Sequence, residues 1–256
     1  MKRTISTKSK TIRRRAVSSG PVSVGPANRQ LLADLVAANR ILADYGVLDG
    51  YGHVSARHNR DPNRYLLSRS LAPALVTVND IMEYDLDSIP VDAQDRTLYL
   101  ERFIHGEIYK VRPDVQAVVH NHSPSVIPFG VTTVPLRPLY HMAAFIGEGV
   151  PIFEIRDVGG MTDMLIRRPE LGRALAETLG TRAAALMRGH GAVVVGASLA
   201  AVVARSLYLE MNAKLQAQAL ALDPKITYLD PEEARLADLG DYSRAWNLWK
   251  RQVKVK

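Results

Sequence analysis

A strand-forming run that ends in two histidines constrains the fold more than any other part of this chain. The segment 115–122 alternates around Val118 and Val119, which predicts a strand in the centre of a sheet. Because residues two apart on a strand point to the same face, His120 and His122 are expected to project side by side. Neutral imidazoles suit zinc and other first-row divalent ions, although two histidines at a polar strand end give the same pattern.

A third histidine stands in a tight turn. Gly189-His190-Gly191 separates two short apolar segments that we expect to be strands, 184–187 and 192–195. The flanking glycines let the backbone turn sharply and leave the imidazole of His190 little obstructed, although an exposed turn histidine fits the same pattern. Three protein ligands with open positions for substrate are typical of a catalytic metal site. Since the chain has no cysteine, its metal ligands must be His, Asp or Glu.

The other patterns predict helices flanking a largely antiparallel sheet, an α/β fold class. Helices are expected over 29–45, 98–110, 169–179 and 198–221. Further strands are expected over 50–58, 65–68 and 150–155 and at the end of 78–84. Four prolines between 124 and 138 exclude a long regular element there.

Charge and apolar content narrow the possible partners. Seven of the 33 basic residues lie within the first 15 positions, where there is no acidic residue, which leaves 26 basic and 26 acidic residues for the rest. A basic tail without aromatic residues is typical of a solvated, disordered end rather than of a nucleic-acid arm. The longest apolar stretches, of about ten residues, are too short to span a bilayer. We therefore expect a cytoplasmic protein with neither a nucleic-acid nor a membrane partner.

The chain is expected to have three parts. These are a basic disordered tail and linker (1–28), a catalytic domain (29–225) and a C-terminal helical extension (226–256). In the extension, Tyr242, Trp246 and Trp249 lie at helical spacing and form an apolar stripe. The stripe is expected to pack on its own domain or across a neighbouring subunit.

Glu101 is a further candidate for the site. It begins the predicted helix that ends near Lys110, with His105 one turn later on the same face. Its carboxylate could be a fourth metal ligand or could move a proton, but a glutamate at a helix start is also favoured by the helix dipole alone. The spacing does not decide between these roles.

Several motifs follow one another along the chain: Gly52-His-Val-Ser55, Glu101-x-x-x-His105-x-x-x-Tyr109, Arg112-Pro-Asp-Val115, His120-x-His122 and Gly189-His190-Gly191. Their order resembles the class II aldolase and adducin head-domain family. The resemblance implies an αβα fold with a mainly antiparallel sheet and a homotetramer with active sites between subunits. It also implies one divalent metal ion per subunit on His120, His122 and His190. Glu101 would then be the acid/base group, which can approach the metal when substrate is absent.

Departures from the sugar-phosphate aldolases indicate a different substrate. Where those enzymes bind phosphate with a Gly-Asn pair, a Ser-Gly pair and two serines, this chain has Gly52-His53, Ser70-Leu71 and Tyr99-Leu100. The loss of small and hydroxyl-bearing residues argues against a phosphate pocket. The candidates for binding a substrate carboxylate are instead His53, Ser68 and Arg69, the arginine through a bidentate contact.

Residues 137–156 resemble the family branch that decarboxylates hydroxylated aromatic acids, such as a hydroxy-methylpyridine dicarboxylate or dihydroxyphthalate. An aromatic carboxylate with an adjacent hydroxyl can chelate a metal, and loss of carbon dioxide leaves an enolate-like anion that the metal stabilises. Glu101 is the first choice for returning the proton to carbon, with Tyr140 and His141 as alternatives that fit loop packing equally well. The ligand set fits zinc or manganese, and iron is possible.

Two other functions stay open at this stage. An aldolase or epimerase acting on a small non-phosphorylated hydroxy-carbonyl compound would form the same kind of anion without releasing carbon dioxide. An adducin-like binding module would have no catalytic role. The retained histidines and Glu101 disfavour this module, because a scaffold does not need a ligand set with an open position.

Overall fold

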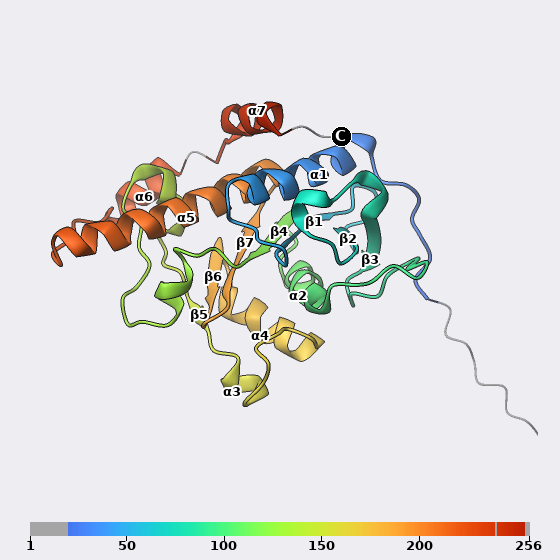
Figure 1. Cartoon of the computed structure of the whole chain (residues 1–256), viewed down its shortest axis with the longest axis horizontal. Helices are drawn as coiled ribbons and strands as arrows, with labels where there is room; N and C mark the ends of the chain where they lie inside the picture. The colour runs from blue at the N-terminus through green and yellow to red at the C-terminus, as the bar shows by residue number, and fades with distance from the viewer. Residues whose placement is uncertain (1–19, 239, 254–256) are drawn as a thin grey trace, which may run out of the picture.

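A sheet of seven strands runs through the middle of the molecule (Figure 1). The computed structural model describes residues 20–238 and 240–253, so most of the expected basic tail lies outside the described residues. The strand order is β3-β2-β1-β4-β7-β6-β5. In sequence order, the strands are β1 (His53–Arg57), β2 (Arg64–Ser68), β3 (Ile81–Asp85), β4 (Ala117–Asn121), β5 (Ile152–Phe153), β6 (Ala184–Met187) and β7 (Gly191–Gly196). Neighbouring strands are antiparallel except β5 and β6, which are parallel.

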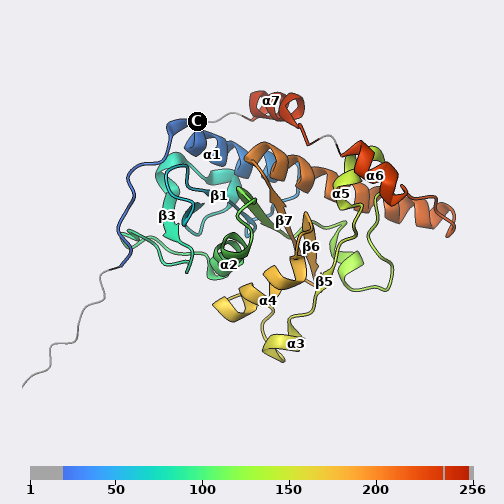
Figure 2. The same ribbon diagram turned by 180° about the vertical axis from the view of Figure 1, so that it is seen from behind.

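Helices cover both faces of the sheet (Figures 1 and 2). One face carries α1 (Arg29–Asp44), α5 (Leu199–Leu222) and α7 (Ser243–Gln252), and the other carries α2 (Phe103–Val111) and α4 (Pro169–Leu179). Two shorter helices, α3 (Arg156–Gly159) and α6 (Pro231–Ala237), lie at the periphery. Successive side chains on a strand point to opposite faces of the sheet and so contribute to both cores. Val119 packs with the first helix layer and Val118 with the second. The predicted αβα arrangement with a mainly antiparallel sheet is confirmed.

The helix predicted over 98–110 begins later than expected. Residues Leu100–Arg102 form a 3₁₀ turn, in which Glu101 has a φ of −92° and a ψ of 18°, and the α-helix starts at Phe103. Glu101 leaves helical geometry because its buried carboxylate accepts a hydrogen bond from the amide of Ile166. Tertiary contacts of this kind override helix propensity. The prediction that Glu101 begins the helix was therefore wrong, although the side chain still faces the sheet.

The strand predicted over 150–155 is also shorter than expected. Only Ile152 and Phe153 pair with β6. Proline at position 151 has no N–H group to donate to a neighbouring strand, which limits β5 at its start.

The apolar stripe of the C-terminal extension packs on its own domain. Trp246 and Trp249 are 8% and 7% exposed and belong to the core that α1 and α5 also form. The ring of Trp249 lies 6.3 Å from that of Tyr45 and 6.1 Å from that of Tyr208. Tyr242 precedes the helix, and its ring lies 6.5 Å from Tyr208. The structure therefore shows the stripe packed on its own domain, which is one of the two placements expected from the sequence.

Replacing Trp249 with alanine is expected to lower the free energy of unfolding by about 3 kcal/mol, because it removes a buried aromatic side chain. Urea denaturation of the full chain measures this change. The control is Leu248→Ala on the same helix, since Leu248 is 55% exposed and its loss should change the free energy by less than about 0.5 kcal/mol. Equal effects of the two substitutions would show that α7 does not bury the tryptophan.

None of the helices in the described ranges has the length and apolar character needed to cross a membrane.

Candidate metal centre

Three histidines from two separate segments meet at one end of the central strands. His120 lies near the end of β4, His122 follows that strand, and His190 lies in the turn between β6 and β7. Antiparallel pairing of β4 with β7 brings the turn to the end of β4, as the pairing of Asn121 with Ala192 shows. The Nε2 atoms of His122 and His190 are 3.1 Å apart. The predicted convergence of the three imidazoles is therefore present.

Glu101 is the fourth member of this cluster. Its Oε2 atom lies 3.3 Å from Nε2 of His120 and 3.5 Å from Nε2 of His190. All four ligand atoms of the cluster lie within 4.8 Å of one another. Burial raises the pKa of Glu101, but the positive charges that the neighbouring imidazoles of His120 and His190 carry when protonated outweigh that effect and hold the pKa well below its usual value. The cluster therefore contains three imidazoles and one anionic carboxylate.

Two glycines make this arrangement possible. Gly189 has a φ of +62°, a conformation that favours glycine and turns the chain so that His190 faces the end of β4. At Gly191, a Cβ atom would lie 1.9 Å from the carbonyl oxygen of Asn121. Any larger residue at position 191 would push the two strands apart and separate His190 from His120.

Each histidine is oriented by a hydrogen bond on the side of its ring that faces away from the cluster. The acceptors are two backbone carbonyls and one ionised carboxylate, and groups of both kinds only accept hydrogen bonds. The contacts are His120 Nδ1 with Ala192 O at 3.2 Å, His190 Nδ1 with Met164 O at 3.1 Å, and His122 Nδ1 with Asp49 Oδ2 at 3.0 Å. Each Nδ1 atom therefore carries a proton, so that each Nε2 atom faces the cluster and is the nitrogen that could bind a metal. Outer contacts of this kind usually orient metal-binding histidines.

The donor set fits a divalent metal ion. Nε2 of His120 is buried and has no hydrogen-bond partner among the described residues. A buried polar atom left without a partner is unfavourable, and a cation between the imidazoles would supply one. Three neutral nitrogen ligands and a nearby carboxylate are a common set for catalytic metal ions. The cluster therefore suits a divalent metal.

Comparison with known families decides which group of proteins this chain is part of. The Class II Aldolase and Adducin N-terminal domain matches residues 33–217, which include all four members of the cluster. The chain belongs to the class II aldolase and adducin family. Within this family, the chain is 38% identical over 246 residues to Decarboxylase tropJ of Talaromyces stipitatus, a match that covers 86% of this chain and 92% of that protein.

Other members of the class II aldolase family agree with this placement. The 3,4-dihydroxyphthalate decarboxylase of Arthrobacter keyseri is 27% identical over 235 residues, which cover 86% of this chain and 91% of the relative. An aldolase II superfamily protein from Pseudomonas syringae has the same fold, with a TM-score of 0.75 at 23% identity over 90% of this chain and 94% of the other. The predicted family, its decarboxylase branch and the assignment of the chain as a lyase are confirmed.

His53 of this class II aldolase family member lies beside the metal centre in a buried hydrogen-bonded chain. It pairs with His120 across β1 and β4, and the two rings are 5.1 Å apart. Its Nδ1 atom lies 2.7 Å from Nε2 of His105, whose Nδ1 atom lies 2.6 Å from the hydroxyl of Ser55. That hydroxyl lies 2.9 Å from the hydroxyl of Tyr109. Burial lowers the pKa of both imidazoles, to about 3 for His105, so both are neutral at pH 7. The contact with His105 therefore occupies Nδ1 of His53 and leaves Nε2 as the other ring nitrogen.

The other two residues predicted to bind a carboxylate differ in accessibility. Arg69 is paired through Nε with Asp80 at 2.6 Å, and its side chain is 37% exposed, which leaves its terminal nitrogens accessible. Ser68 is fully buried, and its hydroxyl lies 3.5 Å from that of Tyr99. Substrate binding by either residue stays a prediction, and the structure favours Arg69 because only its donors reach solvent.

Tyr140 and His141 are not brought to the metal centre of their own chain. His141 is exposed, and Tyr140 packs against the core of the first helix layer. The hydroxyl of Tyr140 is buried without a hydrogen-bond partner among the described residues. Burial raises the pKa of Tyr140 to about 12, so that its hydroxyl stays protonated. The catalytic role predicted for these two residues stays a prediction.

The proline-rich segment before Tyr140 is held by two buried amides of α5. Asn212 bonds to the amide of Leu139 at 2.8 Å and to the carbonyl of Arg137 at 2.8 Å. Gln216 bonds to the amide of Arg137 at 3.0 Å and to the carbonyl of Pro135 at 2.7 Å. The side chains of α5 thus pair with residues 135–139 much as a neighbouring strand would.

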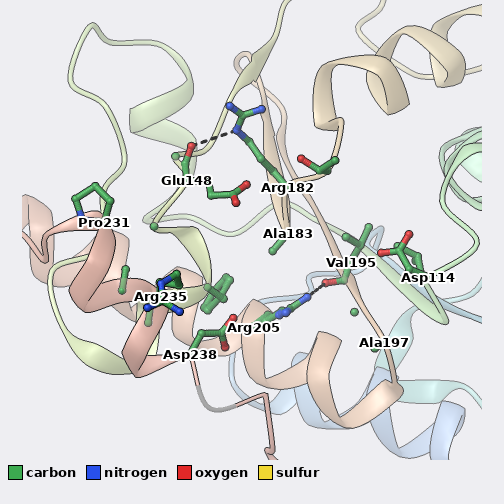
Figure 3. A pocket seen from close by; sticks show the side chains of 18 of the residues that line it. Asp114, Glu148, Arg182, Ala183, Val195, Ala197, Arg205, Pro231, Arg235 and Asp238 are labelled. Atoms are coloured by element: carbon green, nitrogen blue, oxygen red, sulfur yellow. Dashed lines mark hydrogen bonds between the residues drawn. The ribbon is translucent and has the colours of Figure 1, made fainter.

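Figure 3 shows a cavity of about 920 Å³. Its lining residues place it at the opposite end of β4 and β7 from the histidines. It is lined by Val115 before β4 and Val195 near the end of β7, together with Arg182 before β6 and Arg205 of α5. Arg182 donates a hydrogen bond to the carbonyl of Glu148, and Arg205 donates one to the carbonyl of Val195. None of the four cluster residues lines this cavity, so its volume does not mark the metal centre.

Sequence reasoning did not identify Asp49 as part of the centre, because 73 residues separate it from His122. Asp49→Asn is expected to weaken metal binding about 10-fold or more, since an amide is a weaker acceptor and orients His122 less strongly. Competition with a chromophoric chelator measures the affinity. Asp44→Asn removes the same charge from an exposed position at the end of α1 and is the control. Unchanged affinity in Asp49→Asn would show that this contact does not orient His122.

Proposed function

We propose that this chain is a metal-dependent decarboxylase of a hydroxylated aromatic or heteroaromatic carboxylate. The observation that carries the proposal is the cluster of three oriented histidines and Glu101, in a chain whose similar proteins include decarboxylases. Zinc or manganese is the expected metal, with iron as a further candidate, because the set combines imidazoles with a carboxylate and leaves room for oxygen ligands. The proposed assembly is a homotetramer with active sites between subunits.

The surroundings of the cluster support a substrate without phosphate. Tyr99 stands where sugar-phosphate aldolases carry a small phosphate-binding serine, and it is only 6% exposed. Its hydroxyl donates to the carbonyl of Leu71 at 2.5 Å, and its ring lies 4.4 Å from that of His53. The ring of Tyr99 therefore packs against His53 at the position where those enzymes carry the small serine. Arg69 and Nε2 of His53 are the proposed donors to a substrate carboxylate.

In the proposed reaction, the bond between the ring carbon and the carboxylate carbon breaks, and its electron pair stays on the ring. Carbon dioxide leaves, and one proton must be added to the same ring carbon. A divalent metal bound to the histidines would act as a Lewis acid that stabilises the negative charge on the substrate oxygen. Glu101, which is anionic before substrate binds, is proposed to take up the proton of the substrate hydroxyl and to return it to the ring carbon, because the amide of Ile166 holds its Oε1 atom at 2.9 Å and its Oε2 atom faces the cluster.

Tyr140 and His141 remain alternative proton donors. Because neither contacts the cluster of its own chain, either residue would have to act at the site of a neighbouring subunit. This alternative requires the proposed homotetramer, whereas the assignment to Glu101 does not.

The proposal is tested by incubating metal-loaded protein with a panel of ortho-hydroxy aromatic carboxylates and dicarboxylates and measuring carbon dioxide release. Chelator-treated protein and matched substrates without the ortho hydroxyl are the controls, and neither should release carbon dioxide at a comparable rate. No release across the panel, together with cleavage of a non-phosphorylated hydroxy-carbonyl compound, would favour the aldolase or epimerase. Failure to bind metal at all would favour the binding module.

A further inference from the structure

One short segment contacts both sides of the metal centre. The carbonyl oxygen of Met164 accepts the hydrogen bond from Nδ1 of His190 at 3.1 Å. Two residues later, the amide of Ile166 donates to Oε1 of Glu101 at 2.9 Å. The backbone of residues 164–166 therefore contacts one candidate metal ligand and the proposed proton donor, and it uses a carbonyl for the first and an N–H group for the second.

The segment is held in place by its own turn and by the core. Met164 has a φ of +68°, a conformation that residues with a side chain adopt rarely and only where the surroundings determine it. Its amide donates to the hydroxyl of Thr162 at 2.9 Å, and the amide of Leu165 donates to Asp163 at 3.2 Å. The side chain of Ile166 is fully buried in the core shared with α2 and α4. The segment is thus fixed on both sides of Leu165.

The side chain of Met164 also contacts the turn that carries His190. A Cβ atom added to Gly189 would lie 3.2 Å from the terminal methyl carbon of Met164. The backbone of Met164 therefore bonds to His190, and its side chain lies beside the same turn. A change in the backbone of this residue would move the acceptor of His190 and the donor of Glu101 together, because only Leu165 separates the two.

We propose that residues 164–166 are a positioning segment that sets the direction of His190 and of Glu101 at the same time. The carbonyl of Met164 keeps the proton of His190 on Nδ1, which leaves Nε2 free for a metal. The amide of Ile166 holds one oxygen of Glu101, which leaves the other free to face the cluster. The part that concerns Glu101 rests on the proposed function, whereas the part that concerns His190 rests only on the cluster.

Two substitutions at Met164 separate the backbone conformation from the side chain. Isoleucine is β-branched and strongly disfavours a positive φ, whereas asparagine tolerates that conformation. Met164→Ile should therefore shift the carbonyl and weaken metal binding about 10- to 100-fold, the usual effect of losing an outer contact of a metal ligand. Met164→Asn keeps the backbone and should stay within about 3-fold of the unsubstituted protein. Chelator competition without substrate measures both affinities.

Amide hydrogen exchange and nitrogen NMR supply readouts independent of activity. In Met164→Ile, the amide of Ile166 should exchange at least about 10-fold faster, and the proton of His190 should no longer be confined to Nδ1. Both signals should be unchanged in Met164→Asn. Far-UV circular dichroism and the unfolding midpoint check that both variants are folded. If Met164→Ile does not fold, Met164→Val serves in its place, since it is β-branched but smaller.

Equal affinity in the two variants, or an equal loss in both, would overturn the proposal, because neither result depends on the backbone conformation of Met164. A loss of metal affinity in Met164→Ile without faster exchange at Ile166 would show that the two contacts are independent, which also contradicts a shared positioning segment. A failure of the decarboxylase assignment would appear only as missing carbon dioxide release and would leave these affinity and exchange results unaffected.

Discussion

Replacing His190 with alanine is expected to weaken metal binding by more than about 100-fold and to abolish nearly all turnover at micromolar metal. The imidazole contributes one of three converging Nε2 atoms, 3.1 Å from that of His122 and 3.5 Å from the carboxylate of Glu101. Two remaining histidines would not hold a divalent ion tightly, and Glu101 would lose one of its two neighbouring imidazoles. Metal content after dialysis and carbon dioxide release measure the two effects.

His58→Gln is the control for His190→Ala. His58 is also buried, and its Nδ1 atom accepts a hydrogen bond from the amide of Arg60 rather than facing the cluster. Its replacement should leave the metal content unchanged. Full metal occupancy in His190→Ala would contradict the assignment of this residue as a ligand and would require a different set of donors.

Glu101→Gln is expected to keep the metal and to lower turnover by about 10² to 10⁴, the usual contribution of a positioned proton donor or acceptor. The amide has nearly the same shape, and its oxygen can still accept the hydrogen bond from Ile166. It cannot, however, take up a proton and return it as a carboxylate does. A lower kcat with an unchanged metal content and a similar KM would therefore support a role in proton transfer rather than in metal binding.

Glu107→Gln is the matched control for Glu101→Gln. Glu107 is also a buried glutamate of this region, but it pairs with Lys110 at 2.6 Å and is not part of the cluster. This variant should be less stable but should turn over normally. If Glu101→Gln turned over normally, Tyr140 or His141 would instead be assigned as the residue that returns the proton to carbon. Each of these would then have to act across a subunit boundary.

The parts of the molecule that sequence alone predicted are those set by local patterns. Alternation over 115–122 identified β4, and the glycines around His190 identified the turn, because each pattern reports a backbone requirement of its own segment. The convergence of the histidines followed from placing both segments at the same end of one sheet. The position of Glu101 was less predictable, because a contact with Ile166, 65 residues later, draws it out of the helix.

The outer contacts of the centre were beyond sequence reasoning for two reasons. Met164 and Ile166 act through backbone atoms, which every residue type has, so their identities carry no signal. Asp49 acts through its side chain but lies in an ordinary polar turn, and no spacing connects it with His122. By contrast, the chain from His53 to Tyr109 had a signal, since the alternation of His53 with Ser55 and the four-residue step from His105 to Tyr109 place these groups on facing surfaces.

The pairing of α5 with the proline-rich segment has a consequence for altering substrate range. Such a loop would be a natural choice for exchange with the corresponding loop of a relative. Residues 135–139, however, are held by Asn212 and Gln216, which lie 73 or more positions away in the sequence. A grafted loop without matching carbonyls and amides would leave the buried carboxamides of Asn212 and Gln216 without hydrogen-bond partners. Successful grafts at this position should therefore carry their own α5 polar residues with them.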